Sequence, residues 1–156
     1  NHQSNISLDL GSSSVPQNPF NLPSLIGIDI QSSLDNILSV DLSREPIPLQ
    51  DNSVAVITAF HFIEHIPRIS SHLDARFPFI NLMNEIYRTL EPGGLFLSCT
   101  PAYPFQSSFS DPTHLNHITE KTLRYYFSSS PEIIVPMARI YGFYGNFTCI
   151  DQALDG

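Results

Sequence analysis

Apolar residues along this chain gather in short continuous runs rather than in an alternating pattern. Continuous runs of this length are typical of strands that are buried on both faces of a parallel sheet. The runs lie at residues 6–11, 25–30, 36–42, 54–60 and 94–101. We therefore predict five strands of one mostly parallel sheet, and we place a last strand within residues 146–154.

Helical periodicity appears in two later segments. Residues 79–90 carry an apolar face, which "EPGG" then ends, and residues 117–127 predict a second helix with Thr119 as its N-cap. Residues 12–23 contain three prolines, which forbid a long helix between the first two strands. Residues 43–53 are predicted to form a loop. The alternation predicts an α/β fold with a reduced first helix.

Composition narrows the class of protein. The 156 residues are predicted to form a single domain, 1–156, and 42% of them are hydrophobic. The formal charge of −8 disfavours bulk nucleic-acid binding, and no apolar run is long enough for a membrane span. Cys99 and Cys149 lie inside apolar runs, which favours reduced thiols and a cytoplasmic location.

Polar residues and glycine cluster where the predicted strands end, and ligands of α/β proteins bind at that edge. Gly11 permits close approach of a ligand to the backbone. Asp29 follows 18 residues later, close to the position, about 20 residues after such a glycine, of an acid that binds ribose hydroxyls. Asp41 ends the third run and would meet an adenine, so a nucleoside ligand is indicated. The alternatives are a turn glycine at Gly11, a helix cap at Asp29 for residues 31–38, and an ordinary loop acid at Asp41.

The string "HFIEH" gives His61, Glu64 and His65 the His-x-x-Glu-His spacing of a zinc-protease motif. That motif needs both histidines on a sustained helix and a third ligand that converges on them. Here His61 directly follows a strand-like run, and Pro67 leaves room for one or two helical turns. We therefore predict no metal site from this motif; stoichiometric zinc in the purified protein would reverse that interpretation.

The order of these segments resembles a class I S-adenosylmethionine-dependent methyltransferase over roughly residues 6 to 155. The strings that carry the resemblance are "LDLGSSSVPQNPF", "GIDI", "VDLSREPIPLQDNSVAVITAFHFIEHIPR", "EIYRTLEPGGLFLSCTPAYP" and "DPTHLNHITEKTLRYYF". The resemblance implies a Rossmann-like sandwich, S-adenosylmethionine as the cofactor, and methyl transfer to an acceptor, for which we expect a small molecule.

The resemblance also implies which residues line the cofactor. Those from the first turn would lie against its methionine part, those after the second and third strands against its ribose and adenine, and those after the fourth strand near its sulfonium. The first group consists of Asp9, Gly11, Ser12 and Ser13, the second of Asp29, Ile30, Asp41 and Leu42, and the third of Phe60 and His61.

The chain departs from the family in several places. Ser13 stands where a second glycine is usual, and Ala55 where an aspartate is common. The sequence stops at "DQALDG", so the C-terminal β-hairpin is expected to be incomplete, and an open sheet edge suggests a homo-oligomer. A non-catalytic binding or partner module is the alternative function. A nicotinamide-dependent enzyme ranks below both, because "GSSSVP" supplies a single glycine.

The segment "DPTHLNH", residues 111–117, is the candidate acceptor side of the site. A histidine with a near-neutral pKa can take a proton from an acceptor, so His114 is a candidate base and His65 a second one. The alternatives are a turn that begins at Asp111 and satisfies its own backbone, and a surface histidine at 65. Methyl transfer depends mainly on alignment, and a base is needed only where the acceptor must lose a proton.

Overall fold

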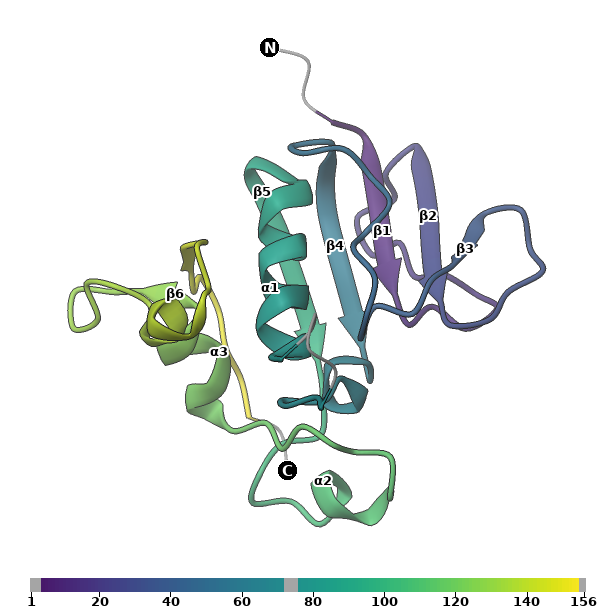
Figure 1. The fold of residues 1–156 in the computed structure, drawn as a ribbon. Coiled ribbons are helices and arrows are strands. Elements are labelled where there is room, and N and C mark those ends of the chain that lie inside the picture. The colour runs from purple at the N-terminus through teal and green to yellow at the C-terminus, as the bar shows by residue number, and fades with distance from the viewer. Residues whose placement is uncertain (1–3, 72–75, 155–156) are drawn as a thin grey trace.

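Five parallel strands form a single sheet in the spatial order β3-β2-β1-β4-β5 (Figure 1). This computed structural model describes residues 4–71 and 76–154. The strands are β1 (Ile6–Leu10), β2 (Ser24–Asp29), β3 (Ile37–Ser39), β4 (Val54–Phe60) and β5 (Leu90–Cys99). The predicted α/β fold with a parallel central sheet is confirmed.

The centre of the sheet is formed by β1, which pairs with β2 on one side and β4 on the other. Leu8 is in register with Ile26 of β2 and Ile57 of β4, and Leu8, Leu10 and Ile57 are fully buried. The chain runs outward from β1 to β3 and then returns to the opposite side of β1 for β4. The carboxyl ends of β1 and β4 therefore form the switch point at which such sheets bind ligands.

One long helix, α1 (Pro78–Thr89), covers a face of the sheet over β4 and β5 (Figure 1). It begins with a proline, whose missing N–H costs nothing at a helix start, and it ends where Leu90 turns extended. Phe79, Leu82 and Ile86 are buried on its inner side. The predicted helix over residues 79–90 is confirmed to within one residue at each end.

The remaining elements are short. They are η1 (Ile63–His65), α2 (Ser107–Ser110), α3 (Glu120–Tyr126), η2 (Met137–Tyr141), β6 (Ser128–Ser129) and β7 (Phe147–Thr148). Thr119 is the N-cap of α3, as predicted: its side chain accepts a hydrogen bond from Lys121 N, and Thr122 Oγ1 accepts one from Thr119 N. In the described part of the chain, no helix has the length and apolar character needed to cross a membrane.

Several segments differ from the predictions. The fifth strand spans residues 90–99 instead of 94–101, and the second helix spans residues 120–126 instead of 117–127. The third strand spans residues 37–39 instead of 36–42, because the chain enters a turn at Asp41, whose carbonyl accepts from Arg44 N and Glu45 N. The last strand has two residues and pairs with β6 instead of joining the sheet. The described residues 31–36 form turns and bends, so Asp29 does not cap a helix.

Candidate functional site

The turn after β1 is held by Asp9, which is buried. Its carboxylate accepts hydrogen bonds from Thr58 Oγ1 at 2.6 Å and from Gln17 N at 2.7 Å. Burial raises the pKa of Asp9, and the hydrogen bonds from Thr58 and Gln17 act in the opposite direction. One carboxylate oxygen of Asp9 thus bonds to β4 and the other to the loop of residues 12–23, so Asp9 stabilises the turn after β1.

Gly11 needs to be glycine for two reasons. The first is its φ angle of +68°, in the left-handed region, in a turn that a hydrogen bond from Gly11 N to Ile28 O at 2.8 Å holds in place. A Cβ at this position would also lie 2.8 Å from Cγ and 2.9 Å from Cβ of Phe62. Phe62, which follows β4, therefore packs on the turn after β1 at the switch point, a contact that the sequence analysis missed.

The two serines after Gly11 have different roles. Ser12 is buried against β2: a Cβ at Gly27 would lie 2.5 Å from its Oγ. Ser13 is exposed, with φ +51°, and its N–H donates to Asp29 Oδ2 at 2.8 Å. The backbone at position 13 therefore has the conformation that glycine adopts most easily, although a serine occupies it.

Asp29 lies at the end of β2, beside this turn. Its Oδ1 accepts from Ile30 N at 2.7 Å, in addition to the bond from Ser13 to Oδ2. A carboxylate has about four acceptor positions, so Asp29 keeps capacity for the hydroxyls of a ligand. Ile30 is 66% exposed at the same edge and offers an apolar surface.

The segment after β3 is more self-contained. Asp41 accepts from Ser43 N at 3.0 Å and from Ser43 Oγ at 2.6 Å, and it lies 3.8 Å from Arg44 Nε. These local bonds match the loop-acid alternative for Asp41. Leu42 is buried in the hydrophobic core. The structure therefore groups Asp29, Ile30 and the first turn, while Asp41 and Leu42 serve the loop and the core.

The chain turns sharply after β4. His61 has φ +50°, its N–H donates to Cys99 O at 2.8 Å, and its side chain is 68% exposed. Phe60 is half-buried at the end of the strand. Residues 63–65 form a single 3₁₀ turn, so His61 and His65 do not share the sustained helix that a zinc-protease motif requires.

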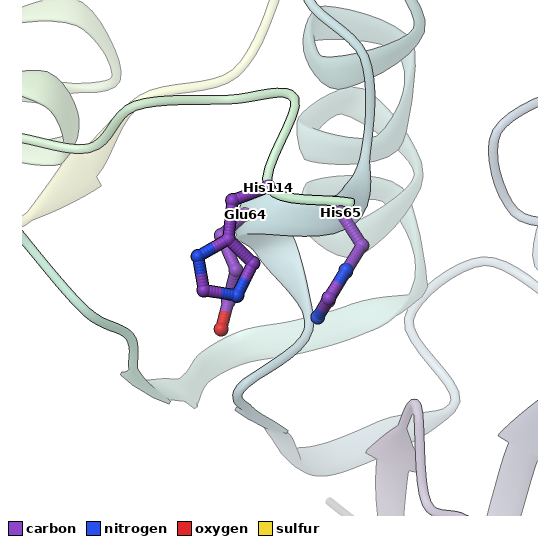
Figure 2. A group of neighbouring side chains, drawn as sticks. All are labelled: Glu64, His65 and His114. Carbon is purple, nitrogen blue, oxygen red and sulfur yellow. The ribbon is translucent and has the colours of Figure 1, made fainter. Parts of the chain in front are cut away.

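A different set of side chains converges at this turn. Glu64 and His65 of η1 meet His114 from the loop after β5, and their side chains extend to the same side (Figure 2). One ligand-type atom of each lies within 4.8 Å of the others, and the two imidazole rings are 4.9 Å apart, edge to face. The two histidines that we predicted as candidate bases are thus neighbours.

Backbone hydrogen bonds dock this loop on η1. Leu115 N and Asn116 N both donate to Glu64 O at 2.9 Å, and Asn116 Nδ2 donates to Ile63 O at 3.2 Å. Arg68 Nε donates to Asn116 Oδ1 at 2.5 Å. Asn116 is buried, so its role is to hold the loop rather than to meet a ligand.

Asp111 shapes the loop that carries His114. Its Oδ1 accepts from Thr113 N at 2.8 Å and from Thr113 Oγ1 at 2.6 Å, and its carbonyl accepts from His114 N. These bonds from Thr113 lower the pKa of Asp111. The predicted turn at Asp111 is therefore present, and it fixes the position of the histidine.

A cavity of about 540 Å³ opens between the start of α1, α3 and the loop after β5. This volume lies within the range of small-molecule sites, about 300–1,000 Å³. Its lining is mostly apolar and aromatic, with cationic side chains beside it: Phe77, Phe79, Tyr103, Phe109, Tyr126, Arg68 and Lys121.

Comparisons with known proteins agree on the fold. No family model matches the chain, and no curated protein matches it. Among solved structures, a methyltransferase described as S-adenosylmethionine-dependent from Archaeoglobus fulgidus is similar, with a TM-score of 0.56, 17% identity and 78% of this chain covered. The putative methyltransferase in a complex with the Haloferax volcanii Trm112 methyltransferase activator is similar with a TM-score of 0.54 and 15% identity, again over 78% of this chain. This chain covers 57% and 58% of the lengths of those two chains.

Proposed function

Because the chain has the fold of class I S-adenosylmethionine-dependent methyltransferases, we propose that it binds S-adenosylmethionine and transfers the methyl group to a small-molecule acceptor. One observation carries the proposal. The Asp29 carboxylate, at the end of β2, bonds to the backbone of the turn after β1, beside the switch point between β1 and β4. That is where a nucleoside cofactor binds in this class of sheet.

In this proposal the cofactor lies along the carboxyl edge of the sheet. Asp29 accepts hydrogen bonds from the ribose hydroxyls, and Ile30 packs on the adenine. The methionine part lies along Gly11, Ser12 and Ser13, where it contacts the Phe62 ring. Phe60 and His61 are placed near the sulfonium, while Asp9 holds the turn and Asp41 and Leu42 support the adenine side through their loop.

The reaction asks little of side chains. A nucleophilic atom of the acceptor attacks the methyl carbon, the bond from that carbon to sulfur breaks, and S-adenosylhomocysteine leaves. If the acceptor carries a proton on the attacking atom, that proton must be lost, and His114 or His65 is proposed to assist this loss. The 540 Å³ cavity beside the same loop is the proposed acceptor site, and its aromatic lining favours an apolar or aromatic acceptor.

The first test is calorimetric titration with S-adenosylhomocysteine. We expect stoichiometric binding to the wild type, and binding about tenfold or more weaker for Asp29→Asn, because hydrogen bonds to a charged group contribute roughly 1.5–3 kcal/mol. Asp35→Asn is the matched control: it removes the same charge from an exposed position nearby and should bind as the wild type does. Full affinity in Asp29→Asn would refute the assignment of Asp29.

A non-catalytic partner module is the second candidate, supported by a specific observation. Leu95, Leu97 and Cys99 are exposed along one face of β5, the edge strand of the sheet. Such a face suits a second protein chain, either a partner or another copy. This candidate predicts no cofactor binding and association in light-scattering measurements. Methyl transfer to any acceptor would exclude it.

A further inference from the structure

We propose that Glu64, His65 and His114 bind a divalent transition-metal ion of the Zn²⁺ class. Two imidazole nitrogens and one carboxylate oxygen form a recurrent ligand set for such ions, which leaves further coordination positions open. This set differs from the His61–Glu64–His65 motif, because its third ligand comes from the loop after β5. Its metal binding does not depend on the proposed methyl transfer.

The hydrogen bonds of His65 determine which nitrogen is available. Its Nδ1 lies 3.2 Å from Thr113 O and 3.0 Å from Thr113 Oγ1. The carbonyl can only accept, and the hydroxyl proton of Thr113 is already donated to Asp111 Oδ1. Nδ1 of His65 must therefore carry the ring proton, and a neutral ring then presents its lone pair at Nε2.

His114 is oriented in the same way. Its Nδ1 faces Ser108 O at 3.4 Å, which again places the proton on Nδ1 and the lone pair on Nε2. Metal-binding histidines commonly donate the other ring N–H to a carbonyl, and that bond fixes the ring. Asp111 Oδ2 stands 3.8 Å from Nε2 of His114 and adds negative charge beside the site.

Glu64 provides the independent observation that points to a ligand. Its side chain is 2% exposed. Oε2 accepts from Thr100 Oγ1 at 2.8 Å, but Oε1 is buried and has no hydrogen-bond partner among the described residues. Burying a carboxylate oxygen without a partner is costly, and a cation would remove that cost. His61 Nδ1, at 3.7 Å from Oε1, is too distant for a hydrogen bond.

The spacing requires only a small contraction. Ligand atoms at about 2.0–2.2 Å from a tetrahedral ion lie roughly 3.3 Å from one another. The three ligand-type atoms here lie within 4.8 Å of one another. His114 sits on a loop, so an ion can draw it toward η1 without disturbing the sheet.

The site lies just beyond β4, where we place the sulfonium end of the cofactor. On the proposed function, an acceptor oxygen or nitrogen at an open metal position would be aligned with the methyl group, and its pKa would fall. Metal binding would occupy the Nε2 lone pairs that a general base needs, so His65 and His114 would act as ligands rather than as bases. The bound ion would instead make the acceptor lose its proton more readily.

The experiment uses the full chain after treatment with a chelator, titrated with ZnCl₂ by calorimetry and with Co²⁺ by visible absorption. We expect one ion per chain, and Co²⁺ bands of a low-coordinate site with nitrogen ligands. His65→Gln, His114→Gln and Glu64→Gln should each weaken Zn²⁺ binding at least about tenfold. His117→Gln is the matched control: it removes an imidazole from the same loop outside the cluster and should bind normally.

Each outcome is decisive. No binding of Zn²⁺ or Co²⁺ at millimolar concentration would overturn the proposal, as would equal binding by the wild type, His65→Gln and His114→Gln. His65 is half-buried and His114 lies on a loop, so these two variants keep the test valid if Glu64→Gln fails to fold. Titration of the same metal-free chain with S-adenosylhomocysteine reports on the cofactor site separately, so failure of one proposal is distinguishable from failure of the other.

Discussion

The contact between Gly11 and Phe62 can be tested by replacing Gly11 with alanine. Alanine at φ +68° costs about 1–2 kcal/mol, because its Cβ approaches the following carbonyl. The Cβ would also overlap the Phe62 side chain, and overpacking of this kind costs about 1–3 kcal/mol more. The expected loss for Gly11→Ala is therefore about 2–5 kcal/mol.

Gly93→Ala isolates the backbone part of this cost. Gly93 has φ +83°, and a Cβ there would meet no described atom within 4 Å. The Gly93→Ala variant should lose only the about 1–2 kcal/mol of stability that alanine costs in the left-handed region. The effect of alanine on the unfolded chain is similar at both positions and cancels in the comparison.

Urea denaturation and thermal unfolding measure the difference. In a chain of this size, 1 kcal/mol lowers the Tm by roughly 2–4 °C, so Gly11→Ala should unfold about 2–12 °C below Gly93→Ala. Adding Phe62→Ala to Gly11→Ala should recover the overlap cost in a double-mutant cycle. Equal stability of the two alanine variants, or no coupling to Phe62, would refute the packing of Phe62 on the turn.

Three further predictions concern the same structure. Ser13→Gly relieves the strain of a serine at φ +51°, so it should be neutral or stabilising by up to about 1 kcal/mol in urea denaturation. The control Ser14→Gly in the same loop should destabilise by about 0.5–1 kcal/mol, and a larger loss in Ser13→Gly would contradict the strained backbone. The raised pKa of Asp9 favours its protonated form in the folded state, so the wild type should gain stability relative to Asp9→Asn as the pH falls from about 7 toward 4. That gain should be lost as the pH rises through the folded pKa. If the difference in unfolding free energy between the two proteins is the same at every pH, the reasoning is refuted. The Arg88 guanidinium donates hydrogen bonds to Glu85, to Asp51 and to the carbonyls of Ile47 and Leu49, and the carboxylates of Glu85 and Asp51 raise its pKa. Arg88→Lys should therefore cost about 1–2 kcal/mol of stability in thermal unfolding, while the exposed control Arg124→Lys costs little.

Much of the fold could be predicted from the sequence, because its physical causes are local. Continuous apolar runs indicated strands buried on both faces, and a 3.6-residue apolar period indicated α1. The capping side chain of Thr119 and the helix stop at "EPGG" are chemical signals that lie within a few residues of where they act. The predictions were less accurate where local signals are weak: β3 is shorter than expected, and β7, although it lies within the predicted residues 146–154, has two residues and pairs with β6 outside the five-stranded sheet.

The candidate site depended on contacts between distant parts of the chain. The spacing of Gly11 and Asp29 predicted the two ends that the structure brings together, because parallel neighbours β1 and β2 place them at one edge. No local pattern indicated that Phe62 would pack on Gly11, or that a loop after β5 would bring His114 to Glu64 and His65. The sequence by itself determined the residue types and the strand ends. The order of the strands in the sheet decided which of these residues contact one another, because side chains remote in sequence can converge only after the strands that carry them have paired.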